Sequence, residues 1–282
     1  MRKIATIGFF DGVHKGHCFL FEQLQTIAAQ RGLQPLIVTF DTHPRTVLQS
    51  DYMPQLLTSL EERQALLNRF GEVLVLPFAD VQPLTAAQFL QHIKDKYEVD
   101  VLLMGYDHQF GSDRLRRPQD YRRIGEQIGI EIITMMEFTE GEWHVSSTEI
   151  RQALENGNIT IANDLLGRPY SLSGIVVHGN GIGHTIGFPT ANIQPDCPEK
   201  IIPRAGVYEV MVNKKRGLCN IGTNPTVGNT ERTIEVHIPA FKGDLYGRTL
   251  TVDFIRFIRE ERKFASLPDL KRQIAEDLAS NL

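Results

Sequence analysis

Short apolar runs alternate with amphipathic segments from residue 3 to about residue 155, and this alternation limits the fold more than any other feature of the chain. Near-continuous apolar runs are typical of parallel strands that are buried on both faces of a sheet. Residues 17–31 have the spacing of an amphipathic helix, and Gly32 provides a left-handed stop. The first half is therefore predicted to be an α/β, doubly wound, Rossmann-like domain. Its predicted strands are residues 3–10, 36–40, 73–78, 99–105 and 130–135.

Two further helix starts are indicated by the S/T-x-x-E pattern of a capping box. Thr58 with Glu61 and Ser146 with Glu149 fit this pattern. We expect a helix to begin after each pair.

The second half has a different sequence pattern, in which strand-like segments follow one another with short turns between them. Such an arrangement predicts an antiparallel sheet or small barrel, closed by one helix at residues 266–280. We place the boundary near residues 160–170, which gives domains of residues 1–165 and 166–282. The predicted strands are residues 207–212, 218–221, 233–238 and 250–258, with turns at 213–217 and 242–244.

Composition excludes several classes of protein. A formal net charge of -4 argues against a large nucleic-acid-binding face. Cys18, Cys197 and Cys219 are an odd number without CxxC spacing, which speaks against a disulfide framework and a zinc knuckle. Asp11 interrupts the first apolar run before it reaches the length of a signal-peptide core, and no stretch has the ~20 apolar residues of a membrane helix. We expect a cytoplasmic protein with small-molecule substrates, no nucleic-acid or membrane partner, and an oligomeric state that the sequence leaves open.

The stretch GFFDGVHKGH, residues 8–17, is the turn between the first predicted strand and the first helix. In an open parallel sheet, ligands bind beyond the carboxyl ends of the strands. Gly12 and Gly16 let the backbone come close to a phosphate, and the imidazoles of His14 and His17 add directional donors. Such donors stabilise the charge that develops as pyrophosphate leaves. An alternative is a metal site that combines these histidines with Asp11, Asp41 and His43.

Polar residues also follow the other predicted strands. They lie in FDTHP (residues 40–44), GYDHQFG (105–111) and SSTEIR (146–151). Ser147, Thr148 and Arg151 stand at a helix start and suit a triphosphate, through hydroxyl, backbone and guanidinium contacts. The alternative for SSTEIR is a plain helix cap with a surface arginine.

A second constellation begins with HGNGIGHTIGFPTAN, residues 178–192. No P-loop lysine or helix pattern follows its glycines, so the stretch is neither a Walker loop nor a dinucleotide fingerprint, and a flexible hairpin is the alternative. Thr190 and Asn192 offer neutral oxygens that suit Mg²⁺ on nucleotide phosphates. Glu235, in IEVHI, shares a strand face with Thr233 and His237 and could orient or deprotonate an attacking hydroxyl, or be a solvated surface carboxylate. The other motifs are PRAGVY (203–208), NIGTNPTVG (220–228), DLYG (244–247) and IREERKF (258–264).

In their order and spacing, the first set of motifs looks like the N-terminal module of the bacterial bifunctional riboflavin kinase/FMN adenylyltransferase (FAD synthetase) family. The second set resembles the riboflavin kinase module of that family, a six-stranded antiparallel barrel. The resemblance spans nearly the whole chain. It implies that riboflavin is phosphorylated by ATP to FMN, that FMN is adenylylated to FAD with release of pyrophosphate, and that both steps need Mg²⁺.

Carried over by position, the resemblance assigns a role to each motif residue. His14, His17 and Glu235 would be catalytic, and Thr190 and Asn192 would also bind the metal. Contacts to ATP in the adenylyltransferase site would come from Gly8, Phe10, Asp11, Gly16, Ser147, Thr148 and Arg151. Flavin contacts there would come from Asp41, His43, Asp107 and Phe110. The kinase nucleotide site would comprise Gly181, Gly183, Gly187, Phe188, Pro189, Thr190 and Asn192, and Arg259 would bind flavin.

Three residues depart from the usual family pattern, namely Phe9, Asp107 and His108, and the arginine-rich residues 114–123 also differ. Two rival functions stay open. One is an adenylyltransferase for another acceptor such as nicotinamide mononucleotide, which would have no use for the second set of motifs. The other is a flavin-binding regulator without catalysis, against which the retention of the catalytic residues argues.

Overall fold

The computed structural model describes residues 2–49, 51–106, 108–136, 139–140, 143–179, 181–226, 229–241 and 243–281. The chain forms two compact units, residues 1–147 and 148–282. None of the helices in the described ranges is both long enough and apolar enough to cross a membrane.

The first unit contains a five-stranded parallel sheet with the order β3-β2-β1-β4-β5. This order confirms the predicted Rossmann-like fold. It reverses between β1 and β4, so the residues that follow β1 lie at the switch point where ligands bind in such sheets. The strands are β1 (Lys3–Ile7), β2 (Gln34–Phe40), β3 (Glu72–Leu76), β4 (Val99–Met104) and β5 (Glu131–Thr134).

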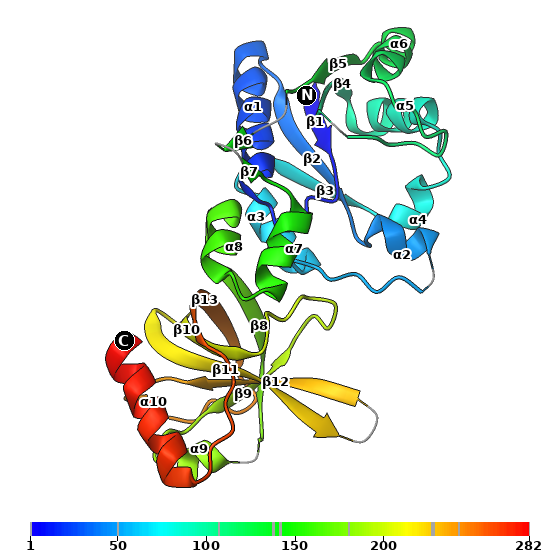
Figure 1. The fold of residues 1–282 in the computed structure, drawn as a ribbon. Coiled ribbons are helices and arrows are strands. Elements are labelled where there is room, and N and C mark those ends of the chain that lie inside the picture. Colours follow the sequence, from blue (N-terminus) through cyan, green and yellow to red (C-terminus); the bar gives the residue numbers. More distant parts are fainter. Residues whose placement is uncertain are drawn as a thin grey trace. The chain divides into compact units, whose positions relative to one another are not determined.

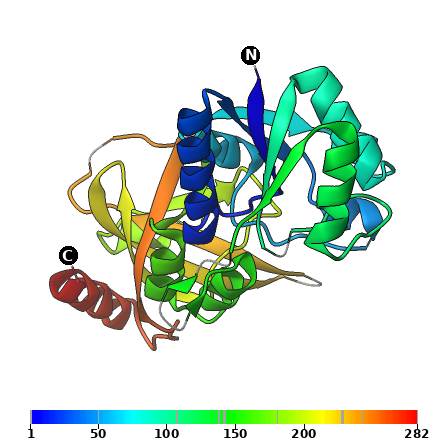
Figure 2. The same cartoon turned by 90° about the horizontal axis from the view of Figure 1, so that it is seen from above.

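Helices cover both faces of this sheet (Figures 1 and 2). Helix α1 (Lys15–Arg31) packs on one face through Leu20, Phe21 and Leu24, which are fully or almost fully buried. Helices α5 (Ala86–Tyr97) and α6 (Pro118–Ile128) cover the other face. As predicted, Gly32 ends α1 in a left-handed conformation, with φ of 65°. The shorter elements are α2 (Pro44–Leu48), α3 (Leu60–Leu67), α4 (Phe78–Val81), β6 (Thr139–Glu140) and β7 (Trp143–His144).

Helix α3 begins one residue later than its predicted capping box. Ser59 Oγ accepts a hydrogen bond from the Glu62 amide at 3.2 Å, and Glu62 Oε2 accepts one from the Ser59 amide at 3.0 Å. The prediction that Thr58 and Glu61 form this box is wrong. The hydroxyl of Thr58 is engaged elsewhere, because it donates to the Asp11 carboxylate at 3.1 Å.

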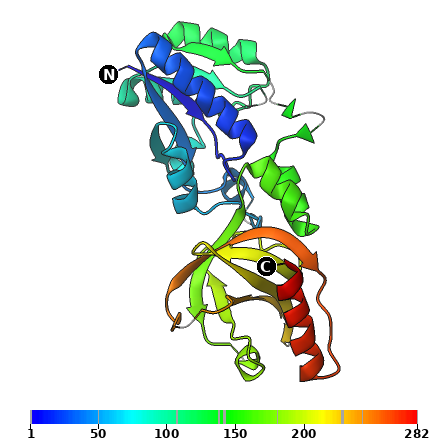
Figure 3. The same ribbon diagram turned by 90° about the vertical axis from the view of Figure 1, so that its left-hand side faces the viewer.

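The second unit is a closed barrel with the strand order β10-β11-β12-β9-β8-β13 (Figures 1 and 3). Four of its strands follow the predicted runs, whereas β8 and β9 were not visible as strand patterns. The strands are β8 (Tyr170–Val177), β9 (Ala191–Pro195), β10 (Gly206–Val212), β11 (Lys215–Thr226), β12 (Asn229–His237) and β13 (Thr249–Arg259).

Helices α7 (Ser147–Glu155) and α8 (Ile159–Leu166) precede the barrel in sequence, and α10 (Leu267–Asn281) follows it. Figure 3 shows α10 in red, running along the outside of the barrel. A four-residue helix, α9 (Ile182–Thr185), lies within the glycine-rich stretch, where no helix was predicted. Helix α8 is joined to the barrel through Asn163. The Asn163 side chain donates to the Phe254 carbonyl at 2.8 Å and accepts from the Tyr170 amide at 2.7 Å.

Candidate active sites

The loop after β1 places two histidines at the N-terminus of α1. His14 is the N-cap residue, and its Nδ1 accepts a hydrogen bond from the His17 amide at 3.3 Å. Because Nδ1 accepts, the neutral ring of His14 carries its proton on Nε2. The two rings are stacked, with centroids 3.6 Å apart and an interplanar angle of 18°. A pair of imidazoles at a helix N-terminus is suited to an anionic ligand.

The conformation of this loop depends on close packing around Gly8, Phe10 and Gly16. Phe10 is buried, and its ring meets that of His17 edge-on at 5.2 Å, so the predicted ATP-contact residue Phe10 is a core residue that supports His17. A Cβ at Gly8 would lie 2.6 Å from the Phe10 ring, so only glycine fits there. A Cβ at Gly16 would approach the His14 ring to 3.3 Å.

The SSTEIR motif is divided at the boundary between the two units. Ser147 closes the first unit, and its hydroxyl donates to the Asp11 carbonyl at 2.9 Å. Thr148 and Arg151 follow in α7, which belongs to the second unit. The rival metal site has little support, because the Asp11 carboxylate is bonded to residues 57–58. Within the described residues, no three or more His, Cys, Asp or Glu side chains gather in a way that could hold a metal ion.

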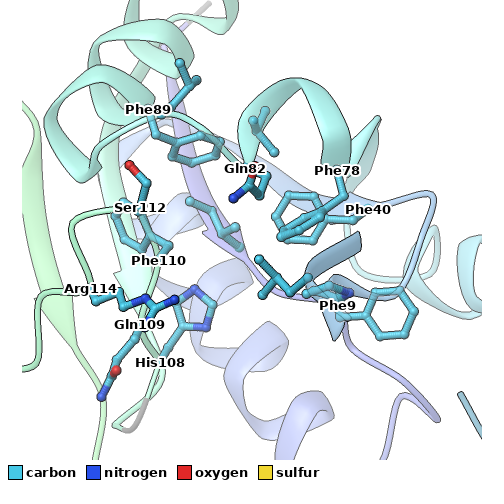
Figure 4. A pocket seen from close by; sticks show the side chains of 16 residues that line it. Phe9, Phe40, Phe78, Gln82, Phe89, His108, Gln109, Phe110, Ser112 and Arg114 are labelled. Atoms are coloured by element: carbon cyan, nitrogen blue, oxygen red, sulfur yellow. The ribbon is translucent and has the colours of Figure 1, made fainter. Parts of the chain in front are cut away.

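A cavity of about 330 Å³ lies at the carboxyl edge of the parallel sheet (Figure 4). In the view of Figure 4, Phe9, Phe40 and Phe78 lie on one side of it, and His108 and Arg114 lie on the other. Aromatic walls with a polar side are typical of sites for flat, partly polar ligands. The residues that line the cavity are Ile7, Phe9, Phe40, Pro44, Leu48, Phe78, Val81, Gln82, Leu84, Phe89, His108, Gln109, Phe110, Gly111, Ser112 and Arg114.

Of the three predicted flavin-contact residues that the structure describes in this unit, Phe110 lines the cavity, whereas Asp41 and His43 do not. Asp41 accepts a hydrogen bond from the Phe78 amide at 3.0 Å. His43 caps α2 through the Arg45 amide, and its ring meets Phe9 edge-on at 4.8 Å, so it supports a cavity residue. The prediction for Asp107 lies outside the described residues.

Three aromatic residues of this cavity were not predicted to belong to a site, namely Phe40, Phe78 and Phe89. A usable signal was present for two of them, because Phe40 ends β2 and Phe78 follows β3 closely. Phe9 was noted only as a departure from the family pattern. Its ring is covered by the guanidinium of buried Arg63, which lies 4.0 Å from the ring centroid.

In the second unit, the predicted residues Thr190 and Glu235 lie together. The Thr190 hydroxyl donates to Glu235 Oε2 at 3.3 Å. Glu235 in β12 is the direct cross-strand partner of Asn192 in β9 and of Asn220 in β11. Residues opposite one another on neighbouring strands project from the same face of a sheet. Glu235 therefore stands in a polar row between two asparagines, and Asn220 was not assigned a role from the sequence.

Two cavities share Thr190. The larger, of about 280 Å³, is lined by Gly183, Phe188, Asn220, Glu235 and His237 among others. The smaller, of about 180 Å³, is lined by Pro189 and by Asp244, Leu245 and Tyr246 of the DLYG motif. Such an arrangement can hold two ligands whose reacting ends meet near Thr190.

Arg259, predicted to contact flavin, lines the larger cavity with its guanidinium bonded to Asp277 of α10. The shortest contact, from Arg259 Nη2 to Asp277 Oδ2, is 2.8 Å, and the two side chains are 13% and 5% exposed. A two-pronged ion pair with so little exposure fixes α10 against the barrel wall.

The glycine-rich stretch allows close packing around these residues. A Cβ at Gly179 would lie 2.1 Å from the Asn192 side chain, and one at Gly183 would lie 2.3 Å from the Phe188 carbonyl oxygen. Gly181 and Gly187 have φ values of 69° and 89°, in the region that favours glycine. Gly179 and Gly183 therefore lie tightly against Asn192 and Phe188, respectively.

Comparison with known proteins assigns a family to each half of the chain. A FAD synthetase family model matches residues 1–149, and a riboflavin kinase family model matches residues 166–281. The bifunctional riboflavin kinase/FMN adenylyltransferase of Escherichia coli K12 is 39% identical over 97% of this chain and 90% of its own length. The Bacillus subtilis protein of the same description is 36% identical over 98% of this chain and 90% of its own length. The chain belongs to the bifunctional riboflavin kinase/FMN adenylyltransferase family.

Among solved structures, a crystal structure described as a macrolide-efflux protein from Streptococcus pneumoniae is 32% identical to this member of the family. It has a TM-score of 0.90 and covers 100% of this chain and 94% of its own. The fold of this family member is therefore shared with an experimental structure along its whole length.

Proposed function

We propose that this chain phosphorylates riboflavin with ATP in its barrel domain and adenylylates the resulting FMN in its Rossmann-like domain. The products are FAD and pyrophosphate. The similarity of both halves to named bifunctional enzymes supports this proposal over an adenylyltransferase for nicotinamide mononucleotide. The structural observation that carries it is the 3.3 Å contact between Thr190 and Glu235, at the junction of two cavities.

In the kinase reaction, riboflavin occupies the larger barrel cavity and the nucleotide occupies the smaller one. The terminal ribityl hydroxyl attacks the γ-phosphorus, its proton passes to Glu235, and ADP leaves with the electrons of the broken P–O bond. Asn192 and Asn220 flank Glu235 and orient its carboxylate or the attacking hydroxyl. Arg259 holds α10 over the flavin cavity through Asp277.

The residues around Thr190 fit Mg²⁺. The donor set consists of oxygen atoms alone, namely a threonine hydroxyl, an asparagine amide and a carboxylate. Mg²⁺ prefers a few protein oxygens together with water and phosphate oxygens. Thr190 and Asn192 would hold the ion, which supplies positive charge that neutralises the phosphates when it is bound.

In the adenylyl transfer, FMN occupies the aromatic cavity of the first domain. An oxygen of its phosphate attacks the α-phosphorus of ATP, and the bond to the bridging oxygen breaks to release pyrophosphate. The imidazoles of His14 and His17 donate hydrogen bonds to phosphate oxygens and stabilise the charge that develops on the leaving group.

Incubation with riboflavin, ATP and Mg²⁺, followed by chromatography of the flavins, tests the proposal. The wild-type enzyme should produce FMN and then FAD. Glu235→Gln should lower riboflavin phosphorylation ~100- to 10,000-fold, because it removes the base but keeps the size of the side chain. His17→Ala should lower FAD formation from FMN ~100- to 1000-fold, because it removes a phosphate donor.

Each variant is the folding control for the other activity. Glu235→Gln should still convert FMN to FAD, and His17→Ala should still phosphorylate riboflavin. A Glu235→Gln enzyme that phosphorylates riboflavin at the wild-type rate would refute the catalytic role of Glu235. Formation of neither flavin by the wild type would refute the proposed function.

We also propose that the enzyme acts in the cytoplasm. Cys18, Cys197 and Cys219 are all free thiols, a state that a reducing compartment maintains. Fractionation of the source cells with detection of FAD formation in each fraction tests this location.

A further inference from the structure

The carboxylate of Asp11 is held by a segment 46 residues away in sequence. Asp11 is only 4% exposed. The Leu57 amide lies 3.0 Å from both of its carboxylate oxygens, and the Thr58 amide donates to Oδ1 at 3.0 Å. The Thr58 hydroxyl donates to the same oxygen at 3.1 Å. The Asp11 carboxylate is therefore engaged by donors of residues 57–58 within the protein.

Thr58 also binds the loop itself. Its Oγ accepts a hydrogen bond from the Gly12 amide at 3.1 Å, and the residue is 3% exposed. One hydroxyl group thus donates to Asp11 and accepts from Gly12. Both groups would be buried with fewer partners if the hydroxyl were removed, which is unfavourable for an anion and for an amide.

The loop that Thr58 holds has a strained backbone. Phe10, Gly12 and Val13 have φ values of 54°, 81° and 41°. A positive φ is unfavourable for a bulky or β-branched residue, and it persists only when the surroundings enforce it. This strained turn leads directly into His14, the N-cap of α1.

The opposite side of Asp11 is bonded to a third segment. Its carbonyl oxygen accepts the hydroxyl of Ser147 at 2.9 Å. Asp11 therefore connects three segments of the first unit. They are residues 57–58, the loop that carries His14, and Ser147.

We propose that Thr58 is a positioning residue for adenylyl transfer, which acts by holding Asp11 and Gly12 and thereby aligns His14 and His17 with the phosphates. This inference rests on the proposed function of the first domain. Thr58 lies next to the capping residue Ser59, but its own hydroxyl takes no part in the cap. Its role is therefore separate from the stability of α3.

Three variants test this role. Thr58→Val removes the hydroxyl and nearly keeps the shape, whereas Thr58→Ser keeps the hydroxyl. Thr6→Val is a matched control in β1, since Thr6 is fully buried and its hydroxyl has no hydrogen-bond partner among the described residues. Steady-state kinetics of FAD formation from FMN should be measured well below the melting temperature of each variant.

We expect Thr58→Val to lower kcat for FAD formation about 10- to 100-fold, because small misalignments of catalytic groups have effects of this size. The KM for FMN should change little, since the aromatic cavity is untouched. Thr58→Ser and Thr6→Val should retain nearly the wild-type kcat, and riboflavin phosphorylation should be normal in all three. If Thr58→Val does not fold, Asp11→Asn should show the same loss of kcat.

If the role of Thr58 were purely structural, Thr58→Val would have a lower melting temperature but a normal kcat when assayed well below that temperature. That result would overturn the inference. Equal loss in Thr58→Ser and Thr58→Val would also overturn it, because the hydroxyl would not be responsible. A wild-type enzyme that makes no FAD from FMN would refute the proposed function of this domain, and this role with it.

Discussion

His237 shows how a residue outside the predicted set can control the kinase site. Its Nδ1 lies 2.8 Å from the Pro189 carbonyl oxygen, and because a carbonyl only accepts, Nδ1 carries the proton. The ring also meets Phe188 edge-on at 5.4 Å. His237 therefore fixes the two residues that precede Thr190.

We expect His237→Leu to lower riboflavin phosphorylation about tenfold, since the loss of one positioning hydrogen bond amounts to roughly 1 kcal/mol or more. His237→Asn should retain most activity, because the asparagine amide can donate from nearly the position of Nδ1. The measurement is the initial rate of FMN formation at several Mg²⁺ concentrations. FAD formation from FMN should be equal in all variants, and a fully active His237→Leu would show that the Pro189 contact is dispensable.

The three cysteines should differ in reactivity. Cys219 is fully buried, and burial raises its pKa well above that of a free thiol. Burial also raises the pKa of Cys197, whereas Cys18 is half-buried on α1. The thiolate is the form that reacts, so a raised pKa leaves less of it at neutral and mildly alkaline pH.

Alkylation with iodoacetamide followed by peptide mass spectrometry should therefore label Cys18 before Cys219. Labelling of Cys219 should begin only when denaturant opens the barrel. Equal labelling of the two thiols in the native enzyme would be inconsistent with a closed barrel around Cys219.

Helix α3 shows that a local sequence pattern predicts the presence of a helix more accurately than the residue at which the helix begins. Thr58 with Glu61 and Ser59 with Glu62 both match the capping-box pattern. The choice is made by a tertiary contact, because Asp11 binds Thr58 from 47 residues away. A local pattern contains no information about that partner.

The strands also show that a local pattern does not reveal contacts with distant residues. The five parallel strands were predictable because each is a short, mainly apolar run between helical segments. In contrast, β8 and β9 contain polar residues such as Ser171 and Asn192, which weaken the apolar pattern. Asn192 is polar because it belongs to the row beside Glu235, so the feature that concealed the strand is part of the site.

Candidate site residues could be selected from the sequence where they lie in a short motif. Residues that line a cavity were harder to select, because the fold determines which side chains come together. Thr190 and Glu235 were each singled out from their motifs, and the structure adds that the two are in contact. The aromatic cavity could not be outlined completely from the sequence, because Phe89 in α5 looks like an ordinary core residue until the fold brings it to the cavity. The partner of Arg259 was likewise hidden in a helix 18 residues away.

At the scale of the whole molecule, the residues between the two family-model matches belong with the barrel. Helix α8 is bonded to β8 and β13 through Asn163, and the Arg204 amide donates to the Leu154 carbonyl at 3.1 Å in α7. A fragment that starts at Thr148 keeps these bonds, whereas one that starts at Ser171 loses both helices and the Tyr170 core residue.

We therefore expect the fragment of residues 148–282 to fold and phosphorylate riboflavin. A fragment of residues 171–282 should have a markedly lower melting temperature, because each buried hydrogen-bond partner that is lost leaves a group costing about 1–3 kcal/mol. Circular dichroism melts and FMN formation measure both properties. Equal melting temperatures would place the domain boundary at residue 165 or later rather than at residue 148.

The dual position of His14 has a consequence for how this sequence can change over evolutionary time. Its side chain caps the first turn of α1 in addition to its proposed role toward the phosphates, and loss of an N-cap costs roughly 0.5–2 kcal/mol. A lineage that no longer needs adenylyl transfer is released from the imidazole but still needs the cap. In such descendants residue 14 should drift to Asn, Asp or Ser, while residue 17, whose side chain is not the cap, should change to other residues that pack against Phe10.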